Sequence, residues 1–393
     1  MIPAAGMERV IVTRRGAGRS RAGHPWIYRS DVVSVPGAVA SGDAVAVADD
    51  RGRPLGTAFY SAASQIALRF LTRDRIEVDD AFVLDRIASA LALRERLFPG
   101  ATSLRLVHGE ADLLPGLVVD RYGDTLVIQT GIPATDRRQE AICDRLLALT
   151  GASAIVERND GRTRLLEDLP QVKGVLRGSY QAPSVYREGD AVLAVDLLEG
   201  QKTGAFLDQR ENHLRSAAYA SGRALDLFSY AGGFALQVAT AADSVKAVEI
   251  SEAACEAIRG NAAASGRKNV EVVCANAFDL LRDEIAAGAQ YDTIVLDPPA
   301  FAKSKAAIAA ATRGYKEINL RAVQLLAPGG VLLTFSCSYH VSAEAFEALV
   351  TDAARDARRD VQVLERLGAG RDHPVLLTAP ETRYLKGLVL RVP

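Results

Sequence analysis

Residues 223–249 constrain the fold of this chain more than any other stretch. A short apolar run at 224–228 reads as a buried strand, Gly232-Gly233 and an alanine-rich helical segment follow, and a second apolar run at 245–248 ends in Glu249. This order of strand, glycine turn, helix, strand and acid predicts a βαβ unit of a parallel sheet. Glycine lets the backbone approach a ligand, and an acid after the second strand can accept hydrogen bonds from both hydroxyls of a ribose.

The glycine spacing discriminates between two nucleotide cofactors. Only two adjacent glycines are present, so the dinucleotide fingerprint G-x-G-x-x-G is missing. Asp226, at the end of the first strand, would repel a pyrophosphate but attract a cation. S-adenosylmethionine carries a sulfonium, an ammonium and a ribose but no phosphate, so we expect this cofactor rather than NAD. The alternative is an ordinary βαβ turn without a ligand.

The composition is that of globular domains with substantial cores. The chain has 393 residues, of which 49% are apolar and 24% charged, and this length suits two or three domains. No apolar run reaches the roughly 18 residues of a membrane span, and the N-terminus lacks the apolar core of a signal peptide. The four cysteines are scattered without metal-ligand spacing, so we expect neither a metal site nor a disulfide. The resulting expectation is a cytoplasmic protein.

The first 75 residues differ in charge from the whole chain. They hold 11 arginines, no lysine and 6 acids, whereas the formal net charge of the whole chain is −1. Short apolar runs between glycine and proline turns predict a small β-barrel at residues 1–75. We expect this domain to contact phosphates through basic residues such as Arg14 and Arg15. Trp26 can stack on a nucleic-acid base; the alternative is that it fills the small core.

Residues 76–190 predict a central α+β domain. A helix is expected at 79–98, strands around a Pro-Gly turn at 104–122 and at 125–129, a second helix at 137–149 and a strand at 154–157. We interpret His108 and Glu110 as turn and strand-end residues rather than catalytic groups. Residues 160–184 read as a polar loop that offers a second phosphate-contacting surface. The basic residues of this surface are Arg162, Arg164, Lys173 and Arg177.

From residue 191 onward, strands and helices alternate. A strand at 191–197 precedes the polar turn 200–210, which we expect to fold over the cofactor and which contains Lys202, Gln209 and Arg210. Further strands are expected at 224–228, 245–249, 270–274, 292–296 and 330–335, and helices at 233–242, 251–264, 279–286 and 311–327. This alternation predicts a parallel sheet covered on both faces, with the site at the carboxyl ends of the strands.

Polar residues gather at those predicted strand ends. Asp226, Glu249, Asn276, Asp297 and Cys337 each stand at or just after the end of one strand. The first glycine turn adds further residues to the expected cofactor site: Phe228, Ser229, Tyr230, Gly232 and Gly233. Because the ends of parallel strands share one edge of a sheet, we expect these groups to lie together.

Asp297-Pro298-Pro299 ends an apolar strand abruptly. Two prolines withdraw two amide donors and force the following chain off the sheet. In a methyltransferase, such a motif at this place holds the target base against the methyl group. Some N-methyltransferases have an aromatic residue directly after the second proline, whereas here Ala300 stands before Phe301. This order disfavours methylation of an exocyclic amine.

Cys337 is the expected nucleophile. It lies between two serines at the end of the last predicted strand. C5 of cytosine is too weakly nucleophilic to take a methyl group unaided, but a thiolate that adds to C6 creates an enamine that can attack. Asp297 would hydrogen-bond N3 and the exocyclic amine as charge develops. The alternative is a small buried residue without a function, which is our interpretation of the other cysteines: Cys143, Cys255 and Cys274.

The chain resembles the ribosomal RNA large subunit methyltransferase I family, which makes 5-methylcytosine in 23S ribosomal RNA. The resemblance covers nearly the whole chain. It is carried by His24-Pro25-Trp26, Ala63-Ser64-Gln65-Ile66, Gly109-Glu110-Ala111-Asp112, Gly200-Gln201-Lys202-Thr203-Gly204, Leu207-Asp208-Gln209-Arg210, Phe228-Ser229-Tyr230-Ala231-Gly232-Gly233-Phe234, Asp297-Pro298-Pro299, Arg313-Gly314-Tyr315-Lys316, Phe335-Ser336-Cys337-Ser338, Asp372-His373-Pro374-Val375 and Tyr384-Leu385-Lys386-Gly387.

The resemblance implies three domains. These are an RNA-binding PUA domain at 1–75, a central strand–strand–helix–strand–strand domain at 76–190 and a Rossmann-like S-adenosylmethionine-dependent methyltransferase domain at 191–393. It also implies that Cys337 is the nucleophile, that 23S ribosomal RNA or a large-subunit precursor is the substrate, and that the protein is a homodimer. The residues that we expect to contact the RNA are Arg14, Arg15, Trp26, Lys202, Arg210, Pro298 and Pro299.

Two departures from the family pattern concern the site. The family often has an acid where Asn276 stands, although an amide carbonyl can still accept a bond from the adenine amine. The broader group of RNA cytosine-C5 methyltransferases carries a second cysteine after the Asp-Pro motif, and here that neighbourhood is Ala300-Phe301-Ala302. The base that removes the C5 proton is therefore not identified by the sequence.

Three other functions remain as alternatives. A related RNA methyltransferase acting on guanine would need no thiol, so Cys337 disfavours it. A small-molecule methyltransferase with a β-rich appendage is disfavoured by the basic N-terminal region. A non-catalytic RNA-binding assembly factor is disfavoured because Glu249, Asp297 and Cys337 all fall on one predicted edge.

Overall fold

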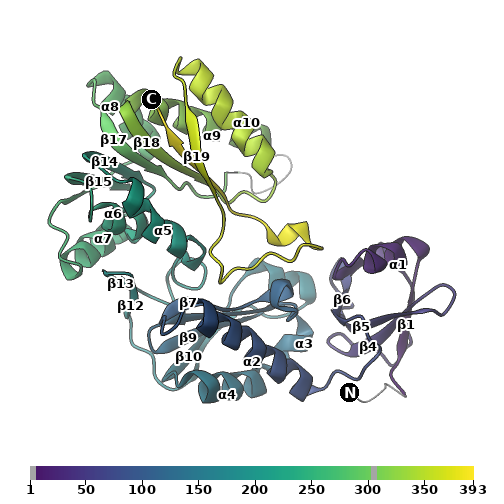
Figure 1. Cartoon of the computed structure of the whole chain (residues 1–393). Coiled ribbons are helices and arrows are strands. Elements are labelled where there is room, and N and C mark those ends of the chain that lie inside the picture. The colour runs from purple at the N-terminus through teal and green to yellow at the C-terminus, as the bar shows by residue number, and fades with distance from the viewer. Residues whose placement is uncertain (1–5, 302–307) are drawn as a thin grey trace. The chain divides into compact units, whose positions relative to one another are not determined.

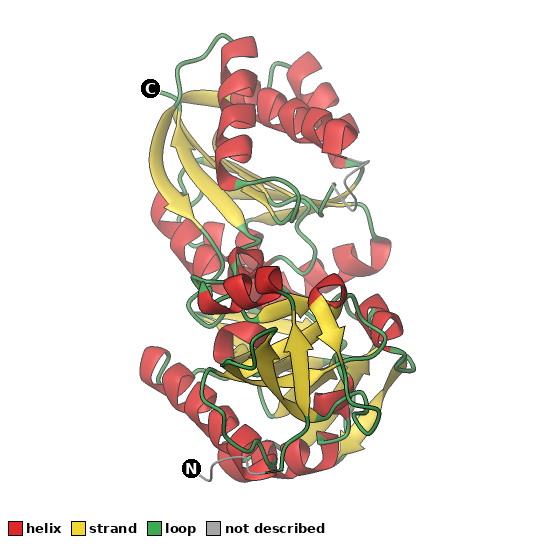
Figure 2. Ribbon diagram, turned by 90° about the vertical axis from the view of Figure 1, so that its right-hand side faces the viewer, coloured by secondary structure: helices red, strands yellow, loops and turns green. Residues whose placement is uncertain are grey.

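The computed structural model describes residues 6–301 and 308–393 (Figure 1). The chain divides into two compact units. Unit 1 comprises Met1–Ser184, Asp196–Gly204 and Asp372–Thr382, and unit 2 comprises Val185–Val195, Ala205–Arg371 and Arg383–Pro393. The chain therefore passes from unit 1 to unit 2 within residues 200–210, between Gly204 and Ala205. Figure 2 shows sheets flanked by helices.

Unit 1 contains a six-stranded N-terminal sheet with the strand order β2-β6-β5-β4-β1-β3. Its strands are β1 (Arg9–Val12), β2 (Trp26–Tyr28), β3 (Val32–Ser34), β4 (Ala44–Asp49), β5 (Pro54–Tyr60) and β6 (Ile66–Thr72). β1 and β4 pair in parallel and the other neighbours pair antiparallel. Val10, Val12, Leu68 and Phe70 alternate along their strands and meet in one core. The expected short strands are thus present.

The basic stretch before Trp26 is helical, which the sequence analysis missed. Helix α1 spans Arg14–Arg21, and the Thr13 side chain caps it by accepting from the backbone N–H of Gly16. Two glycines among eight residues are poor helix formers, so the helix gives a weak signal. Gly16 is closely packed, because a Cβ there would lie 3.0 Å from Cβ of Asp31.

The second sheet of unit 1 has five strands in the order β11-β10-β9-β8-β7. They are β7 (Ser103–His108), β8 (Leu117–Tyr122), β9 (Thr125–Thr130), β10 (Ala154–Asn159) and β11 (Val172–Arg177), accompanied by helices α2 (Asp80–Leu97), α3 (Pro133–Asp136) and α4 (Gln139–Thr150). Only β9 and β10 pair in parallel. Val83 and Ile87 of α2 and Ile142 of α4 pack into its core. The predicted central α+β fold is confirmed.

The prediction of a polar loop at 160–184 is wrong. This segment contains a 3-10 helix, Arg162–Glu167, and the strand β11, which pairs antiparallel with β10. β11 lies at the edge of its sheet and none of its side chains is fully buried. An edge strand of this kind lacks the apolar alternation that identifies a strand in sequence.

Unit 2 includes a seven-stranded sheet and, from Val185 onward, a two-stranded hairpin. The hairpin consists of β12 (Ser184–Glu188) and β13 (Ala191–Val195). The strands of the large sheet are β14 (Arg223–Leu227), β15 (Ser244–Glu249), β16 (Val270–Cys274), β17 (Tyr291–Leu296), β18 (Leu326–Ser336), β19 (Gln362–Leu367) and β20 (Lys386–Arg391). Their order is β16-β15-β14-β17-β18-β20-β19, and the pairs from β16 to β18 are parallel while β20 is antiparallel to both neighbours. The predicted parallel-rich sheet is confirmed.

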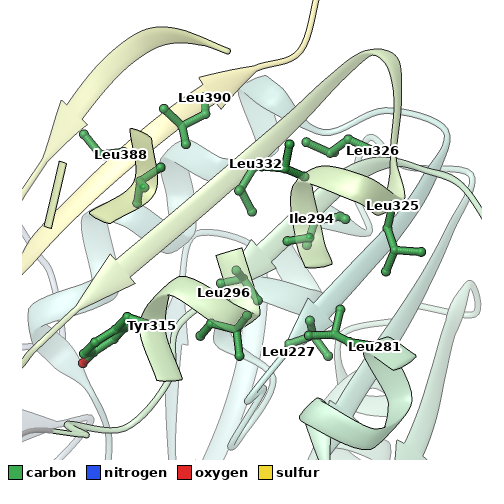
Figure 3. Close-up of a cluster of buried hydrophobic side chains, with 14 of the residues drawn as sticks. Leu227, Leu281, Ile294, Leu296, Tyr315, Leu325, Leu326, Leu332, Leu388 and Leu390 are labelled. Atoms are coloured by element: carbon green, nitrogen blue, oxygen red, sulfur yellow. The ribbon is translucent and has the colours of Figure 1, made fainter. Parts of the chain in front are cut away.

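Helices cover both faces of this sheet. They are α5 (Arg210–Ser216), α6 (Gly233–Val238), α7 (Glu252–Ala264), α8 (Ala277–Ala286), α9 (Ile308–Leu325) and α10 (Ala343–Asp356). One core joins Leu225 and Leu227 to α8, α9 and α10, while the other joins Ala224 to α6 and α7. Successive residues of β14 therefore point into different cores. Figure 3 shows Leu227, Ile294 and Leu332 in the first of these cores.

The last strands and the helix α10 were not predicted. Residues 343–391 contain α10, β19 and β20, and β20 inserts between β18 and β19. β19 is largely exposed. β20 runs antiparallel to β18, which lies some 50 residues earlier in the chain; Leu388, for example, pairs with Thr334. Such a pairing leaves no local signal in the sequence.

Candidate active site

The carboxyl ends of four neighbouring parallel strands carry the predicted site. β14, β15, β17 and β18 end at Leu227, Glu249, Leu296 and Ser336, and the register pairs Leu227 with Leu296 and Leu296 with Thr334. Asp226, Glu249, Asp297 and Cys337 thus stand along one edge of the sheet. The expectation that the strand ends bring these groups to a common edge agrees with the structure.

The turn after β14 has an unusual backbone. Phe228, Tyr230 and Gly232 have φ values of 66°, 49° and 89°, which lie in the left-handed region. Non-glycine residues in this region cost about 1–3 kcal/mol each, and such strain is concentrated at functional sites. The Ser229 N–H donates to the Val248 carbonyl at 3.1 Å, which ties the turn to β15. The turn therefore holds its shape through the adjacent strand.

Asp226 is buried beneath this turn with 1% of its surface exposed. Its Oδ2 accepts from the Ser229 hydroxyl at 2.6 Å and from the Ala235 N–H, in the first turn of α6, at 3.0 Å. Burial raises the pKa of Asp226 to about 7, although the bond from Ser229 and the nearby His213 oppose this shift. The carboxyl group can therefore change charge near neutral pH.

Gly233 has a packing role that involves a residue the sequence analysis did not single out. A Cβ on Gly233 would lie 2.4 Å from Cε1 of His213 in α5. Nδ1 of His213 lies 2.7 Å from Oε2 of Glu188 in β12. Burial alone would lower the pKa of His213, but the Glu188 carboxylate outweighs it and raises this pKa, with smaller contributions from Asp297 and Asp226. His213 and Glu188 follow no sequence pattern that places them here.

Glu249 and Asn276 make backbone contacts at the ends of β15 and β16. Oε2 of Glu249 accepts from the Tyr230 N–H at 3.0 Å, and Oε1 accepts from the Ile250 and Ser251 N–H groups. Oδ1 of Asn276 caps α8 by accepting from the Phe278 and Asp279 N–H groups. The oxygen that we expected to accept from adenine is thus already engaged in a helix cap.

The segment Leu207-Asp208-Gln209-Arg210 belongs to unit 2 and is largely buried. Tyr384 donates its hydroxyl to Oδ2 of Asp208 at 2.7 Å. Oε1 of Gln209 accepts from Asn212 at 2.6 Å, whereas Nε2 of Gln209 is buried without a hydrogen-bond partner among the described residues. A buried amide donor left in this state favours a ligand group as its acceptor.

Cys337 lies one residue beyond β18 and is half-buried. Its thiol is directed at the Pro298 carbonyl, with 3.9 Å between Sγ and the oxygen. Pro298 is buried and Pro299 is exposed, while Asp297 is half-buried. The structure therefore brings the predicted nucleophile against the Asp297-Pro298-Pro299 motif.

The other cysteines have different surroundings. Cys143 and Cys255 are buried, and burial raises the pKa of the Cys143 thiol to about 12. Cys274 is exposed at the end of β16. Its pKa is raised to about 12, chiefly by hydrogen bonding with Cys255 and Glu252. High thiol pKa values disfavour Cys143 and Cys274 as nucleophiles.

The residues of unit 1 that we expected to contact RNA lie mostly at the surface. Arg14 and Lys202 are exposed, and Arg15 pairs with Asp31 at 2.6 Å while 69% of its side chain stays exposed. Trp26 is half-buried and is not among the buried residues of the N-terminal core. Its indole N–H donates to Glu110 at 3.2 Å. Trp26 therefore lies outside the cluster of buried side chains that forms this core.

Of the four basic residues in the predicted second phosphate-contacting surface, three form ion pairs within unit 1 and the fourth, Arg162, is exposed. Arg164 is buried and pairs with Asp136 at 2.7 Å, Lys173 pairs with Glu199 at 2.7 Å, and Arg177 pairs with Glu140 and Asp144. His108, which we interpreted as structural, contacts Arg105 at 3.1 Å and packs against His373 with 5.0 Å between ring centroids and an angle of 60° between the rings. These contacts are internal to unit 1.

Two kinds of feature are absent from the described residues. Within 6–301 and 308–393, no group of three or more histidine, cysteine or acidic side chains is arranged to hold a metal ion. No helix in the same ranges combines the length and apolarity needed to cross a membrane.

Two family models match the chain. A PUA-like domain matches residues 10–73, and an S-adenosylmethionine-dependent methyltransferase matches residues 182–391. The second match covers more than half of the chain. The N-terminal sheet is therefore a PUA-like domain and the seven-stranded sheet is that of an S-adenosylmethionine-dependent methyltransferase, as the sequence predicted. The expected cofactor is confirmed.

Solved structures support the same fold. A proposed S-adenosylmethionine-dependent methyltransferase from Streptococcus mutans has a TM-score of 0.82 and 18% identity, covering 98% of this chain and 100% of the other. The methyltransferase SMU.776, complexed with S-adenosylhomocysteine, has a TM-score of 0.84 at the same identity and coverage. At this identity the similarity shows the fold alone.

Relatives of known name are much closer in sequence. Ribosomal RNA large subunit methyltransferase I from Shewanella amazonensis is 43% identical over 377 residues, which cover 94% of this chain and 95% of the relative. The protein of the same name from Aeromonas salmonicida is 42% identical over 376 residues, with the same coverage. The chain therefore belongs to the ribosomal RNA large subunit methyltransferase I family.

Proposed function

We propose that this chain methylates C5 of a cytosine in 23S ribosomal RNA through a covalent bond between Cys337 and C6 of the base. The observation that carries the proposal is the position of Cys337, whose thiol lies against the Pro298 carbonyl at the sheet edge that also carries Asp226, Glu249 and Asp297. The names of the relatives support ribosomal RNA as the substrate.

The proposed chemistry conserves atoms and charge. The Cys337 thiolate adds to C6, and the electron pair that develops at C5 attacks the methyl carbon. S-adenosylmethionine, when bound, supplies this methyl group and keeps the electron pair of the broken sulfur–carbon bond. A base then removes the C5 proton, the C5–C6 double bond re-forms and the Cys337 thiolate leaves. Asp297 hydrogen-bonds N3 and the exocyclic amine while charge develops there.

The strand-end residues fit the cofactor in different ways. Glu249 would accept hydrogen bonds from the ribose hydroxyls. Asp226, once its carboxyl group is ionised, would stabilise the positive charge of the cofactor. The turn of Phe228, Ser229, Tyr230, Gly232 and Gly233 would bring its backbone against the ligand. The unpartnered Nε2 of Gln209 supports a role as a donor to the cofactor. Asn276 remains a candidate near the adenine.

The RNA would meet basic and aromatic groups outside this edge. Arg14, Arg15 and Lys202 are exposed and would contact phosphates, and Trp26 would stack on a base. Arg210, Pro298 and Pro299 would contact the target nucleotide. The PUA-like match at residues 10–73 supports an RNA-binding role for the N-terminal domain.

A methyl-transfer assay on unmodified 23S ribosomal RNA tests the proposal. Wild type would be run with labelled S-adenosylmethionine beside Cys337→Ala and beside Cys274→Ala, which removes a thiol from the end of another strand of the same sheet. We expect 5-methylcytosine from wild type and Cys274→Ala and none from Cys337→Ala, as identified by mass spectrometry of the nucleosides. Methylguanine as the product, or full activity of Cys337→Ala, would contradict the cytosine mechanism.

We also propose a cytoplasmic homodimer, because the family resemblance implies one and ribosomal RNA is found in the cytoplasm. The chain has a mass of 41.9 kDa. Sedimentation equilibrium of the purified protein at micromolar concentration should therefore give twice this mass. A single species at the monomer mass would contradict the dimer without affecting the proposed reaction.

A further inference from the structure

Lys386 is a buried lysine beside the proposed nucleophile. It begins β20, and the antiparallel register places it opposite Ser336, the residue before Cys337. Only 7% of its surface is exposed. A lysine is rarely buried to this extent without a partner that stabilises its charge.

The ammonium of Lys386 donates hydrogen bonds to two backbone carbonyls, one in the segment that follows β18 and one just before β20. Nζ donates to the Ser338 carbonyl at 2.6 Å and to the Tyr384 carbonyl at 2.8 Å. Carbonyl oxygens are neutral acceptors, so no carboxylate in these two bonds neutralises the ammonium. The Ser338 carbonyl lies just after Cys337, and this bond fixes the segment that carries the thiol.

Lys386 and Cys337 also interact electrostatically. Burial lowers the pKa of Lys386 to about 8, and the negative charge of a Cys337 thiolate opposes this shift. The interaction is reciprocal, because a cation that is stabilised by a thiolate stabilises that thiolate to the same extent. Near neutral pH, Lys386 still keeps most of its charge.

Three of the other groups near Cys337 carry no positive charge, and the positive charge of His213, which also acts on Asp297, is paired with Glu188. Asp297 follows β17 and carries no positive charge in either protonation state. Tyr315 of α9 donates to or accepts from Ser338 Oγ at 2.9 Å, and burial raises its pKa, so it is neutral. Tyr384 donates its hydroxyl to Asp208. Lys386 is therefore the positively charged neighbour whose hydrogen bonds go to carbonyl groups rather than to a carboxylate.

We propose that Lys386 is a positioning residue, whose buried ammonium fixes the Cys337-Ser338 segment and stabilises the thiolate form of Cys337. This inference rests on the proposed role of Cys337 as the nucleophile. Lys386 keeps its proton throughout and does not contact the reacting atoms. It assists the addition to C6 by increasing the fraction of Cys337 that is ionised at neutral pH.

The test is the pH dependence of Cys337 alkylation in the full-length enzyme. Iodoacetamide modification of the peptide containing Cys337 would be followed by mass spectrometry between pH 5.5 and 10, in wild type, Lys386→Met and Lys386→Arg. We expect the wild-type inflection below about 8.5, the value of an ordinary cysteine. Lys386→Met should move it upward by about one pH unit, which lowers the rate at pH 7 about tenfold, and Lys386→Arg should restore much of the difference.

Lys246→Met is the matched control, because Lys246 also lies on a strand of the same sheet but pairs with Glu284 at 2.6 Å. It should leave the Cys337 inflection unchanged. An equal inflection in wild type and Lys386→Met, or an equal shift in Lys246→Met, would overturn the proposal. If Lys386→Met does not fold, the wild-type inflection decides: a value of 8.5 or above overturns the proposal.

Methyl transfer separates this inference from the proposed function. Lys386→Met should lower kcat about tenfold at pH 7, regain activity at higher pH and leave the KM for S-adenosylmethionine unchanged. If Cys337→Ala remained active while Lys386→Met still shifted the alkylation profile, the nucleophile assignment would fail and the electrostatic effect of Lys386 on Cys337 would stand. If Cys337→Ala were inactive but Lys386→Met had the same pH profile of kcat as wild type, the inference about Lys386 would be overturned. The proposed role of Cys337 as the nucleophile would then stand.

Discussion

Nδ1 of His213 and Oε2 of Glu188 lie 2.7 Å apart, and both side chains are almost completely buried. This ion pair connects α5 with the hairpin that precedes the seven-stranded sheet. The ring of His213 also occupies the space that a side chain on Gly233 would need. The position of α6 and its glycine turn thus depends on a pair from distant parts of the sequence.

We expect Glu188→Gln to destabilise the protein by about 2 kcal/mol at pH 6, because the charge that holds protonated His213 is lost. A histidine whose pKa is raised by folding contributes stability that is complete below its unfolded pKa, about 6.5, and is lost as pH rises through the raised value. The difference in the free energy of unfolding between wild type and Glu188→Gln should therefore shrink toward pH 9. Urea denaturation at both pH values measures it.

Glu199→Gln is the control for this prediction, since Glu199 forms an exposed pair with Lys173. Its effect should stay within about 0.5 kcal/mol. A difference for Glu188→Gln that is the same at pH 6 and pH 9 would show that the charge of His213 does not contribute.

Gly233→Ala should destabilise unit 2 by about 1–3 kcal/mol and weaken cofactor binding, because the new Cβ would lie 2.4 Å from the His213 ring. Gly260→Ala is a matched control within α7, where no heavy atom lies within 4 Å of the added Cβ. It should stabilise the protein by about 0.5–1 kcal/mol. Thermal unfolding and calorimetric titration with S-adenosylhomocysteine check both variants, and a neutral Gly233→Ala would rule out the packing argument.

Asp226 should make the stability of the ligand-free protein depend on pH. Burial raises its pKa from 3.8 to about 7, so the stability it contributes is complete below pH 3.8 and is lost as pH rises through about 7. Relative to Asp226→Asn, wild type should lose on the order of 4 kcal/mol between pH 4 and pH 8. Chemical denaturation across this range measures the loss.

Cofactor binding should show the opposite trend with pH. Because the proposed contact needs an ionised Asp226, the affinity of wild type for S-adenosylhomocysteine, whose ammonium is positive, should rise between pH 6 and pH 8. Asp226→Asn should bind more weakly and lack this rise. Asp283→Asn, on the exposed side of α8, should bind as wild type does. A parallel rise in Asp226→Asn would assign the titration to another group.

Leu332→Ala should cost about 2–5 kcal/mol, because Leu332 is fully buried in the core of the large sheet (Figure 3). Leu377→Ala is the control, since 87% of Leu377 is exposed, and its effect should be within about 0.5 kcal/mol. Guanidinium denaturation compares the two. Equal, small effects would mean that the core around Leu332 relaxes around the missing side chain.

The parallel sheet and its edge could be predicted because each element has a local signal. Buried parallel strands read as apolar runs, and the helices between them have their own periodicity, so the ends of β14, β15 and β17 could be read directly. Since all these strands run in the same direction, Asp226, Glu249 and Asp297 had to share an edge. The nature of the residues at that edge then suggested the cofactor.

Other parts of the site depend on contacts that no local pattern encodes. Glu188, His213 and Lys386 are ordinary charged residues in sequence, and each acquires its significance from a partner on another element. The short helix α1 and the exposed strands β11 and β19 lack the apolar periodicity on which sequence analysis depends. The N-cap role of Asn276 was not predicted because the helix was expected to begin at residue 279, whereas α8 begins at Ala277.

The position of β20 determines when the large sheet can be completed during synthesis. β20 spans Lys386–Arg391 and follows β19 in sequence, yet it lies between β18 and β19 in the sheet. Because a ribosome makes β18, β19 and β20 in this order, β19 cannot join the sheet until β20 has been made. Lys386 arrives with β20, the last of the seven strands to be made, so the edge that holds the candidate site acquires this lysine only when β20 pairs with β18.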